Sequence, residues 1–192
     1  MKNMIKQILR ESTDEGKYIK LSVFDFDGTL VDTGLPHAPE GRPSKDEYER
    51  ITKEKWPFTG WWGRKESLST DIFDFKSIDS NKQSFNQEIK NNKTLTLIIT
   101  GRLNKLRPDV INVLKKTGYK INDNNVFCNN NDDTLVFKKN KLDDLLDEYP
   151  SIKYVELWDD RNEHIASFEE WGQNKIKSGR LNDFKMNHVP FD

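Results

Sequence analysis

Two carboxylates that lie two residues apart, Asp25 and Asp27, are the strongest chemical feature of this sequence. They follow the apolar segment 20–24, which predicts a strand, and they precede Gly28 and Thr29. In an extended chain, side chains at this spacing point to the same side and lie about 6.6 Å apart. Two such carboxylates repel each other unless a cation or a proton lies between them. Gly28 lets the backbone turn sharply away from the strand.

Polar side chains also follow the other apolar segments of the chain. In an open α/β sheet the ligand crevice lies beyond the carboxyl ends of the strands, so these side chains are expected to meet at one edge. The candidates are Thr100, Gly101 and Arg102 after segment 94–100, Lys138 after the apolar run 135–137, and Asp159, Asp160 and Arg161 after segment 154–158.

Apolar strand segments alternate with helical segments along the chain. This order predicts a three-layer α/β/α, Rossmann-like fold, with helices on both faces of a mostly parallel sheet. Residues 31–93, rich in Pro, Gly, Ser, Lys and Asp, are expected to form an irregular insert or cap-like region with one helix that Ser44 caps. The expected strands are 20–24, 94–100, 154–158 and 184–189, and the expected helices are 1–16, 44–55, 107–117, 138–148 and 162–173. Residues 122–131 are expected to form an Asn/Asp-rich loop around the short apolar segment 126–128.

The length and composition limit the classes of protein to which this chain can belong. A chain of 192 residues is long enough for one domain, expected over residues 19–192. Residues 1–18 are expected to form an amphipathic helix that either packs on the core or docks a protein partner. The formal net charge of −1 gives no overall attraction to nucleic acid or to an anionic membrane. Without a long apolar run or a signal-peptide segment, the expectation is a soluble, cytoplasmic protein with no membrane partner.

Two further groups of residues leave alternatives open. The segment 56–64 holds three of the five tryptophans of the chain, together with Arg64. These aromatic residues suit either a platform for base stacking or a hydrophobic plug that pins the insert to the sheet, and we favour the plug. His164 follows Asp160 and Arg161, and a helix-capping or surface role is favoured over a role in the site.

The string Phe-Asp-Phe-Asp-Gly-Thr-Leu at residues 24–30 resembles the first signature of the haloacid dehalogenase-like (HAD) superfamily of phosphohydrolases. Thr100, Lys138 and the pair at 159–160 follow in the order of the other three signatures. The strings around these positions are similar to the HAD domain of Swiss Army Knife RNA repair proteins. The Asp-Asp-Arg string at 159–161 is also similar to the phosphatase half of polynucleotide kinase-phosphatases.

This resemblance implies a Mg²⁺-dependent phosphatase that works through an aspartyl-phosphate intermediate. Asp25 would be the nucleophile, and Asp27 would be the general acid and base, with its main-chain carbonyl on the metal. Thr100 would hydrogen-bond a phosphoryl oxygen, Lys138 would stabilise the phosphoryl charge, and Asp160 would hold the metal. The oxygen donors also favour Mg²⁺ on chemical grounds, because no set of Cys and His residues converges.

The remaining assignments concern the substrate and the neighbours of the site. Asp159 is expected to lie beside the metal or to pair with Lys138. Lys139 and Lys141 are possible alternatives to Lys138 as the catalytic lysine. Arg102 and Arg161, with Gly101, are expected to bind substrate phosphate, since a guanidinium matches phosphate bidentately. By resemblance the substrate is a nucleic-acid end, such as a 3′-phosphate in RNA or DNA repair. The alternatives are a phosphatase of nucleotides or small metabolites, and a non-catalytic binding module.

Overall fold

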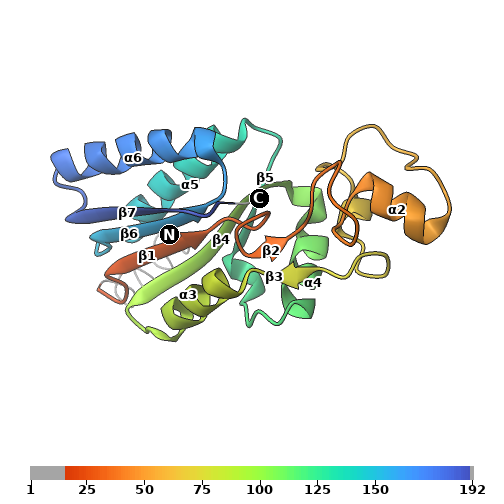
Figure 1. The fold of residues 1–192 in the computed structure, drawn as a ribbon. Helices are drawn as coiled ribbons and strands as arrows, with labels where there is room; N and C mark the ends of the chain where they lie inside the picture. The colour runs from red at the N-terminus through yellow and green to blue at the C-terminus, as the bar shows by residue number, and fades with distance from the viewer. Residues whose placement is uncertain (1–15, 191–192) are drawn as a thin grey trace, which may run out of the picture.

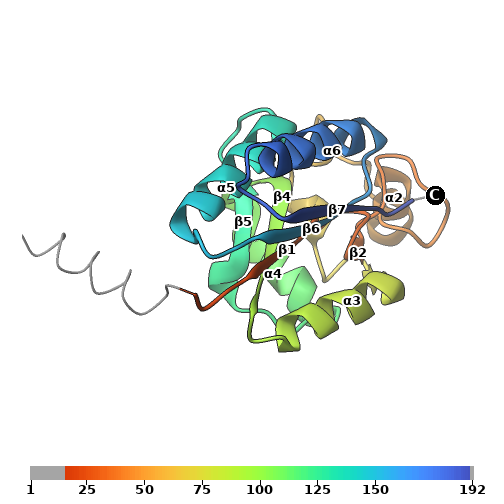
Figure 2. The same ribbon diagram turned by 90° about the vertical axis from the view of Figure 1, so that its left-hand side faces the viewer.

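The structure is a computed structural model that describes residues 16–190. Its five-stranded parallel sheet has the order β5-β4-β1-β6-β7, with α5 and α6 on one face and α3 and α4 on the other (Figures 1 and 2). The predicted three-layer α/β/α fold is therefore confirmed. The strands are β1 Lys20–Phe24, β4 Thr94–Leu103, β5 Val126–Asn129, β6 Tyr154–Asp159 and β7 Asp183–His188, and the helices are α3 Asp79–Lys90, α4 Arg107–Lys116, α5 Thr134–Glu148 and α6 Asn162–Lys177.

Side chains along the central strand alternate between the two helical layers. Leu21 and Val23 of β1 belong to the apolar cluster under α5 and α6. Phe24 points to the opposite face, where it stacks on Trp158 with the ring centroids 4.0 Å apart. Because this period of two continues to the strand end, Asp25 is directed to the same face as Val23.

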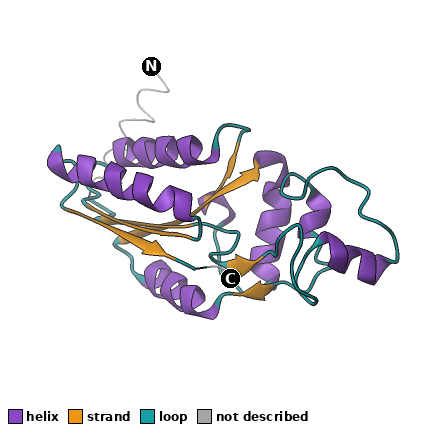
Figure 3. Ribbon diagram, turned by 45° about the horizontal axis from the view of Figure 1, so that its top comes forward, coloured by secondary structure: helices purple, strands orange, loops and turns teal. Residues whose placement is uncertain are grey.

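The insert lies beyond the carboxyl ends of the central strands, on the right-hand side of Figures 1 and 3. It contains the helix α2 Lys45–Thr52, the antiparallel pair of β2 Val31–Asp32 and β3 Lys76–Ser77, and the 3-10 helix Lys65–Leu68. The predicted cap of α2 is present, because Ser44 Oγ accepts a hydrogen bond from the Glu47 main-chain N–H at 3.0 Å. This cap ties the start of α2 to the preceding loop.

The tryptophans of the segment 56–64 lie in two different environments. Trp61 is buried, with its ring 4.9 Å from Trp56 and 5.7 Å from Phe73 between centroids. These residues form the predicted hydrophobic plug. Trp62, the next residue, is 42% exposed and does not belong to it.

The observed helices and strands differ from the prediction at several points. Strand β5 forms where a loop was predicted, and α6 ends at Lys177 rather than at 173. Helix α5 begins at Thr134 rather than Lys138, because Asp133 caps it by accepting from the Val136 main-chain N–H. The apolar run 135–137 is therefore the first turn of a helix. Strand β4 continues past residue 100 to Leu103 through a register shift. Helix α3, within the predicted irregular region, was not predicted, and only its Asn81 and Phe85 are buried.

The N-terminal segment 1–18 falls mostly outside the described residues, which begin at 16. Its amphipathic helix and its docking of a protein partner stay predictions. Within residues 16–190, every helix is too short or too polar to cross a bilayer.

Candidate active site

The residues singled out in the sequence meet at the carboxyl edge of the sheet. Strand β1 lies between β4 and β6, so the ends of these three strands are neighbours. The Asp25 main-chain N–H donates to the Trp158 carbonyl at 2.9 Å, and Val23 is in register with Leu157. This register places Asp25 beside Asp159 on the face that α5 covers.

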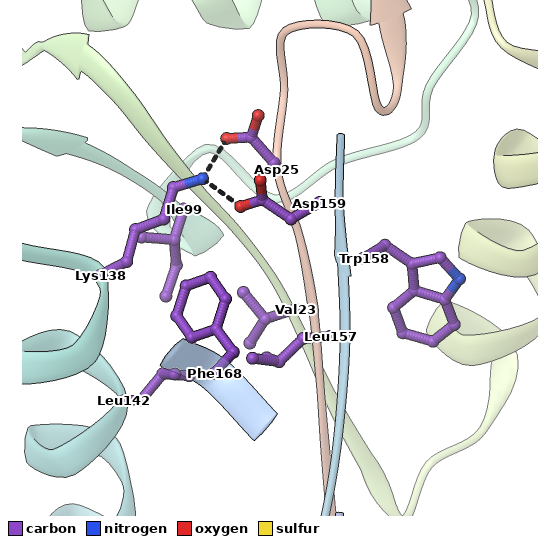
Figure 4. A pocket seen from close by; sticks show the side chains of 9 residues that line it. All are labelled: Val23, Asp25, Ile99, Lys138, Leu142, Leu157, Trp158, Asp159 and Phe168. Carbon is purple, nitrogen blue, oxygen red and sulfur yellow. Dashed lines mark hydrogen bonds and ion pairs between the residues drawn. The ribbon is translucent and has the colours of Figure 1, made fainter. Parts of the chain in front are cut away.

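Lys138 of α5 joins these two acids. Its Nζ donates to Asp25 Oδ1 at 2.8 Å and to Asp159 Oδ2 at 2.6 Å, as Figure 4 shows. The other two candidate lysines have different partners: Lys139 donates to Ser167 Oγ at 3.3 Å, and Lys141 Nζ lies 4.3 Å from the ring centroid of Phe127. Of the three lysines, Lys138 is therefore the one that makes these two contacts.

Apolar side chains surround the stem of Lys138 beneath its ammonium group. The stem of Lys138 passes Ile99 and Leu142, and Val23, Leu157 and Phe168 lie beneath it (Figure 4). Lys138 is only 4% exposed. An ammonium group in such surroundings needs anionic partners, and the two carboxylates supply them.

Asp25, Asp159 and Asp160 form a cluster that we call the three-acid cluster. Each offers one oxygen, and these oxygens lie within 4.8 Å of one another. Three ionised carboxylates and the single ammonium of Lys138 leave a formal charge of −2. Hard oxygen donors with surplus negative charge match Mg²⁺, so the residues present fit the metal that the resemblance implies.

The pKa values within the three-acid cluster reflect this crowding of charge. Burial, together with the charges of Asp159 and Asp160, raises the pKa of Asp25 to about 8 against the opposing effect of Lys138. Burial and the charge of Asp159 raise the pKa of Asp160 to about 7. Burial disfavours the charge on Asp159 as well, but Lys138 and the neighbouring His164 ring hold the pKa of Asp159 below its usual value. Without a metal ion, the protein thus favours protons on two of the three acids.

The Asp27 carboxylate, 20% exposed, has separate partners. Thr33 Oγ1 donates to Asp27 Oδ1 at 2.7 Å. The guanidinium of Arg102 donates through Nη2 to Oδ1 at 2.7 Å and through Nε to both carboxylate oxygens at 3.0 Å. The two acids of the Asp-x-Asp pair therefore contact different cations, Asp25 a lysine and Asp27 an arginine.

Arg102 also ties the insert to this acid. Its side chain is only 1% exposed, and Nη1 donates to the Trp62 carbonyl at 2.8 Å and to Ser67 Oγ at 2.7 Å. The sequence suggested that Arg102 binds substrate phosphate. In the structure its donors are directed to Asp27 and to the insert, because β4 runs three residues further than predicted and carries the side chain inward.

Thr100 and Gly101 pack tightly behind this pair. Thr100 is fully buried, and its Oγ1 donates to Asp27 Oδ2 at 3.4 Å and accepts from the Arg102 main-chain N–H at 3.1 Å. A Cβ on Gly101 would lie 2.8 Å from Thr134 Cγ2, so a larger residue would push the start of α5 away. The close approach of β4 to α5 thus depends on this glycine.

Two residues after β6 approach the same carboxylate oxygen of Asp159. The Arg161 main-chain N–H donates to Asp159 Oδ1 at 3.0 Å, whereas its guanidinium pairs with Glu163 at 2.6 Å. His164 is 3% exposed and its Nδ1 lies 3.4 Å from Asp159 Oδ1, so the favoured surface or capping role is wrong. Its place four residues before buried Phe168, one helical turn away, was the signal for burial.

Asp25 and Asp160 of the three-acid cluster line one cavity of about 400 Å³ together with Asp27. Sequence reasoning missed Gly34, Leu35 and Thr134 in its lining and did not place Trp62 there. The cavity is lined by Asp25, Asp27, Gly28, Gly34, Leu35, Trp62, Gly101, Arg102, Thr134, Lys138, Asp160 and Arg161.

A sequence model of one protein family matches residues 47–191, which is more than half of the chain. It describes HAD domain family 1 in Swiss Army Knife RNA repair proteins. This chain belongs to that family. The predicted family is therefore confirmed, although the matched residues begin after the first signature at 24–30.

Two individual proteins are also similar to this HAD domain. The Saccharomyces cerevisiae protein YMR265C is 25% identical over 171 residues, which cover 79% of this chain and 36% of that protein. The chain thus spans about a third of this relative. The structure of a class C acid phosphatase from Bacillus anthracis, with tungstate bound, superposes with a TM-score of 0.55 at 13% identity, over 98% of this chain and 73% of that chain. By family and fold, the chain is therefore a HAD domain.

Proposed function

We propose that this chain hydrolyses phosphomonoesters in the cavity at the carboxyl edge of the sheet, with Mg²⁺ as cofactor and through an aspartyl-phosphate intermediate. One observation carries the proposal: the Lys138 ammonium contacts both Asp25 and Asp159, and Asp160 completes a cluster of oxygen donors beside them. A nucleophile, a fixed cation and a candidate metal site therefore share a cavity with Asp27.

The metal would be held by the carboxylates of Asp25 and Asp160 and, as the resemblance implies, by the main-chain carbonyl of Asp27. When bound, Mg²⁺ supplies the positive charge that the three-acid cluster lacks and that a phosphate dianion would need. Asp159 would not bind the metal directly, since one of its carboxylate oxygens already accepts a hydrogen bond from Lys138.

In the first step, a carboxylate oxygen of Asp25 attacks phosphorus. The bond between this oxygen and phosphorus forms while the bond from phosphorus to the leaving oxygen breaks. Asp27 donates the proton that the leaving oxygen needs. Lys138 holds the nucleophile in place, and Arg102 holds Asp27. Because Asp27 is 20% exposed, it can exchange protons with water between steps.

In the second step, a water molecule attacks the aspartyl-phosphate at phosphorus. Asp27 takes a proton from this water, and the bond between phosphorus and the Asp25 oxygen breaks. Inorganic phosphate leaves, and both carboxylates return to their starting forms. Overall, one water molecule and one phosphomonoester give an alcohol and inorganic phosphate.

The neighbouring residues are assigned to phosphate binding and positioning. Thr100 would hydrogen-bond a phosphoryl oxygen only by releasing Asp27, to which its buried hydroxyl donates, and Gly101 beside it lines the cavity. Arg161 lines the cavity and would bind phosphate by exchanging its contact with Glu163. For Arg102, the contacts favour a positioning role, because binding phosphate would require it to release Asp27.

A nucleic-acid end, such as a 3′-phosphate, is the proposed substrate class. The support is the family, which is described from RNA repair proteins, and the exposed indole of Trp62 in the cavity wall. We also propose residues 19–192 as the HAD domain, with residues 31–93 as its insert. The alternative is phosphatase activity on nucleotides or small metabolites. The substrate panel described below distinguishes this alternative from activity on nucleic-acid ends.

The chemistry is tested with p-nitrophenyl phosphate and the Asp25→Asn variant. Wild-type protein should release phosphate with Mg²⁺ but not with EDTA, and Asp25→Asn should lower kcat by at least about 10³-fold, since loss of a nucleophile removes the reaction path. Asp147→Asn, on the exposed side of α5, is the control. Activity that survives Asp25→Asn would remove the nucleophile from the proposal, and no activity in any protein would favour a binding module.

The substrate class is tested by comparing kcat/KM across a panel. The panel contains one trinucleotide with a 3′-phosphate, the same trinucleotide with a 5′-phosphate, mononucleotides and sugar phosphates. A nucleic-acid phosphatase should prefer one of the trinucleotides. Preference for mononucleotides would reject the repair substrate and leave the chemistry intact.

A further inference from the structure

The exposed indole of Trp62 has no packing role that would explain its position. Trp61, its neighbour, is 2% exposed and completes the plug, but Trp62 is 42% exposed. A large apolar side chain gains free energy when it is buried, so an exposed one in a cavity wall indicates a surface for a ligand. Trp62 lines the same cavity as Asp25 and Asp160.

Arg102 fixes the position of this indole. The guanidinium carbon lies 4.8 Å from the Trp62 ring centroid, and Nη1 binds the Trp62 carbonyl at 2.8 Å. The same guanidinium is held by the Asp27 carboxylate at 2.7 Å. The indole is thus set in place before any ligand arrives, which lowers the entropy lost on binding. It is also linked through one side chain to the acid that protonates the leaving group.

The remaining space suits the leaving group of a substrate. A cavity of about 400 Å³ is within the range that holds a small organic ligand, and it is too small for a long oligonucleotide segment. Lys138 and the three-acid cluster occupy its charged part. Leu35, 37% exposed, adds a second apolar side chain to the lining. The lining therefore combines a charged part for the phosphate with apolar side chains for the group that carries it.

We propose that Trp62 is the specificity-determining residue of this site and stacks on the base of the nucleotide that carries the phosphate. This inference rests on the proposed phosphatase function and names the part of the substrate that the cavity recognises. Stacking of a base on an aromatic side chain contributes roughly 5- to 150-fold to binding. The enzyme should therefore prefer a phosphorylated end with a terminal base over the same end without one.

The test compares two substrates that differ only in this base. One is a trinucleotide with a terminal phosphate, and the other is the same trinucleotide with an abasic terminal ribose. Wild-type protein should show a kcat/KM higher by roughly 5- to 150-fold for the base-bearing substrate. Trp62→Ala should bring this ratio close to one, and Trp62→Phe should keep most of it. Tyr154→Ala is the matched control, because Tyr154 is 43% exposed at the opposite end of β6.

The outcomes separate stacking from a structural role and from failed chemistry. An equal loss on both substrates in Trp62→Ala would overturn the proposal, since it would reflect disturbed positioning of Arg102 and Asp27. A wild-type ratio near one would overturn it as well. Equilibrium binding of both trinucleotides to Asp25→Asn measures the same ratio without turnover. The stacking proposal is thus tested even if the hydrolytic mechanism is wrong.

Discussion

Two cation-carboxylate contacts lie side by side in this cavity, and they differ in charge balance. Around Lys138, one ammonium contacts the carboxylates of Asp25 and Asp159, with Asp160 beside them, so ionisation of all three acids leaves a formal charge of −2. Around Arg102, one guanidinium meets the single carboxylate of Asp27, and neutral acceptors from the insert take its other donors. The first region is incomplete without another cation, whereas the second is complete as it stands.

The difference indicates a division of labour along one edge of the sheet. Surplus negative charge at the three-acid cluster suits the Mg²⁺ proposed above. The balanced pair at Asp27 instead orients an acid and joins it to the insert. The comparison therefore predicts that metal binding and insert positioning can be disturbed separately.

The largest effect is expected from Lys138→Met. It removes the only ammonium among residues 16–190 that contacts Asp25 and Asp159, and it leaves these two buried carboxylates beside the partly exposed Asp160. This should cost the metal-free protein about 3–5 kcal/mol of unfolding free energy. Urea denaturation in EDTA measures this, and Mg²⁺ should recover part of the loss. Lys139→Met is the control. Equal stability of the two variants would contradict the assigned charge imbalance.

An intermediate effect is expected from Arg102→Met. Loss of the guanidinium leaves Asp27 without its cation and releases Trp62 and Ser67 of the insert. Because Asp27 is partly solvated, the expected cost is about 2–3 kcal/mol in urea denaturation. The Kd for Mg²⁺, measured by calorimetry, should change less than twofold, since Arg102 does not contact the three-acid cluster. A large change in Kd would show that the two regions are coupled.

The smallest effect concerns pH and the three-acid cluster. Burial raises the pKa of Asp25 to about 8 and of Asp160 to about 7, so the metal-free folded protein holds protons that the unfolded chain releases near pH 4. The stability from these two groups is present at low pH and is lost as pH rises through 7 to 8. Mg²⁺ displaces these protons, so its Kd should fall at least about tenfold between pH 6 and 8.

Thermal denaturation checks the same prediction without activity. The increase in Tm on addition of Mg²⁺ should be larger at pH 8.5 than at pH 6. Asp160→Asn should reduce this difference, and Asp147→Asn should not. A pH-independent increase in Tm would indicate that the metal binds elsewhere or that these acids are already ionised.

Much of the fold could be predicted because its signals are local. The apolar runs of β1 and β6 end at acidic residues, which marks both the strands and their carboxyl ends. Helix α3 was missed because it buries only Asn81 and Phe85, which is too little for a helical period to stand out. The start of α5 was misplaced because its first turn is apolar, although Asp133 was present as a cap.

The sequence by itself determined the order of the four signatures and the face on which Asp25 lies, since strand period and strand ends are properties of neighbouring residues. Only the tertiary structure decided which cation meets which carboxylate, that His164 is buried, and that Trp62 rather than Trp61 reaches the cavity. These outcomes depend on contacts between segments far apart in the chain. Such contacts are decided by how the layers pack, because one residue of shift in a strand or helix redirects a side chain to another face.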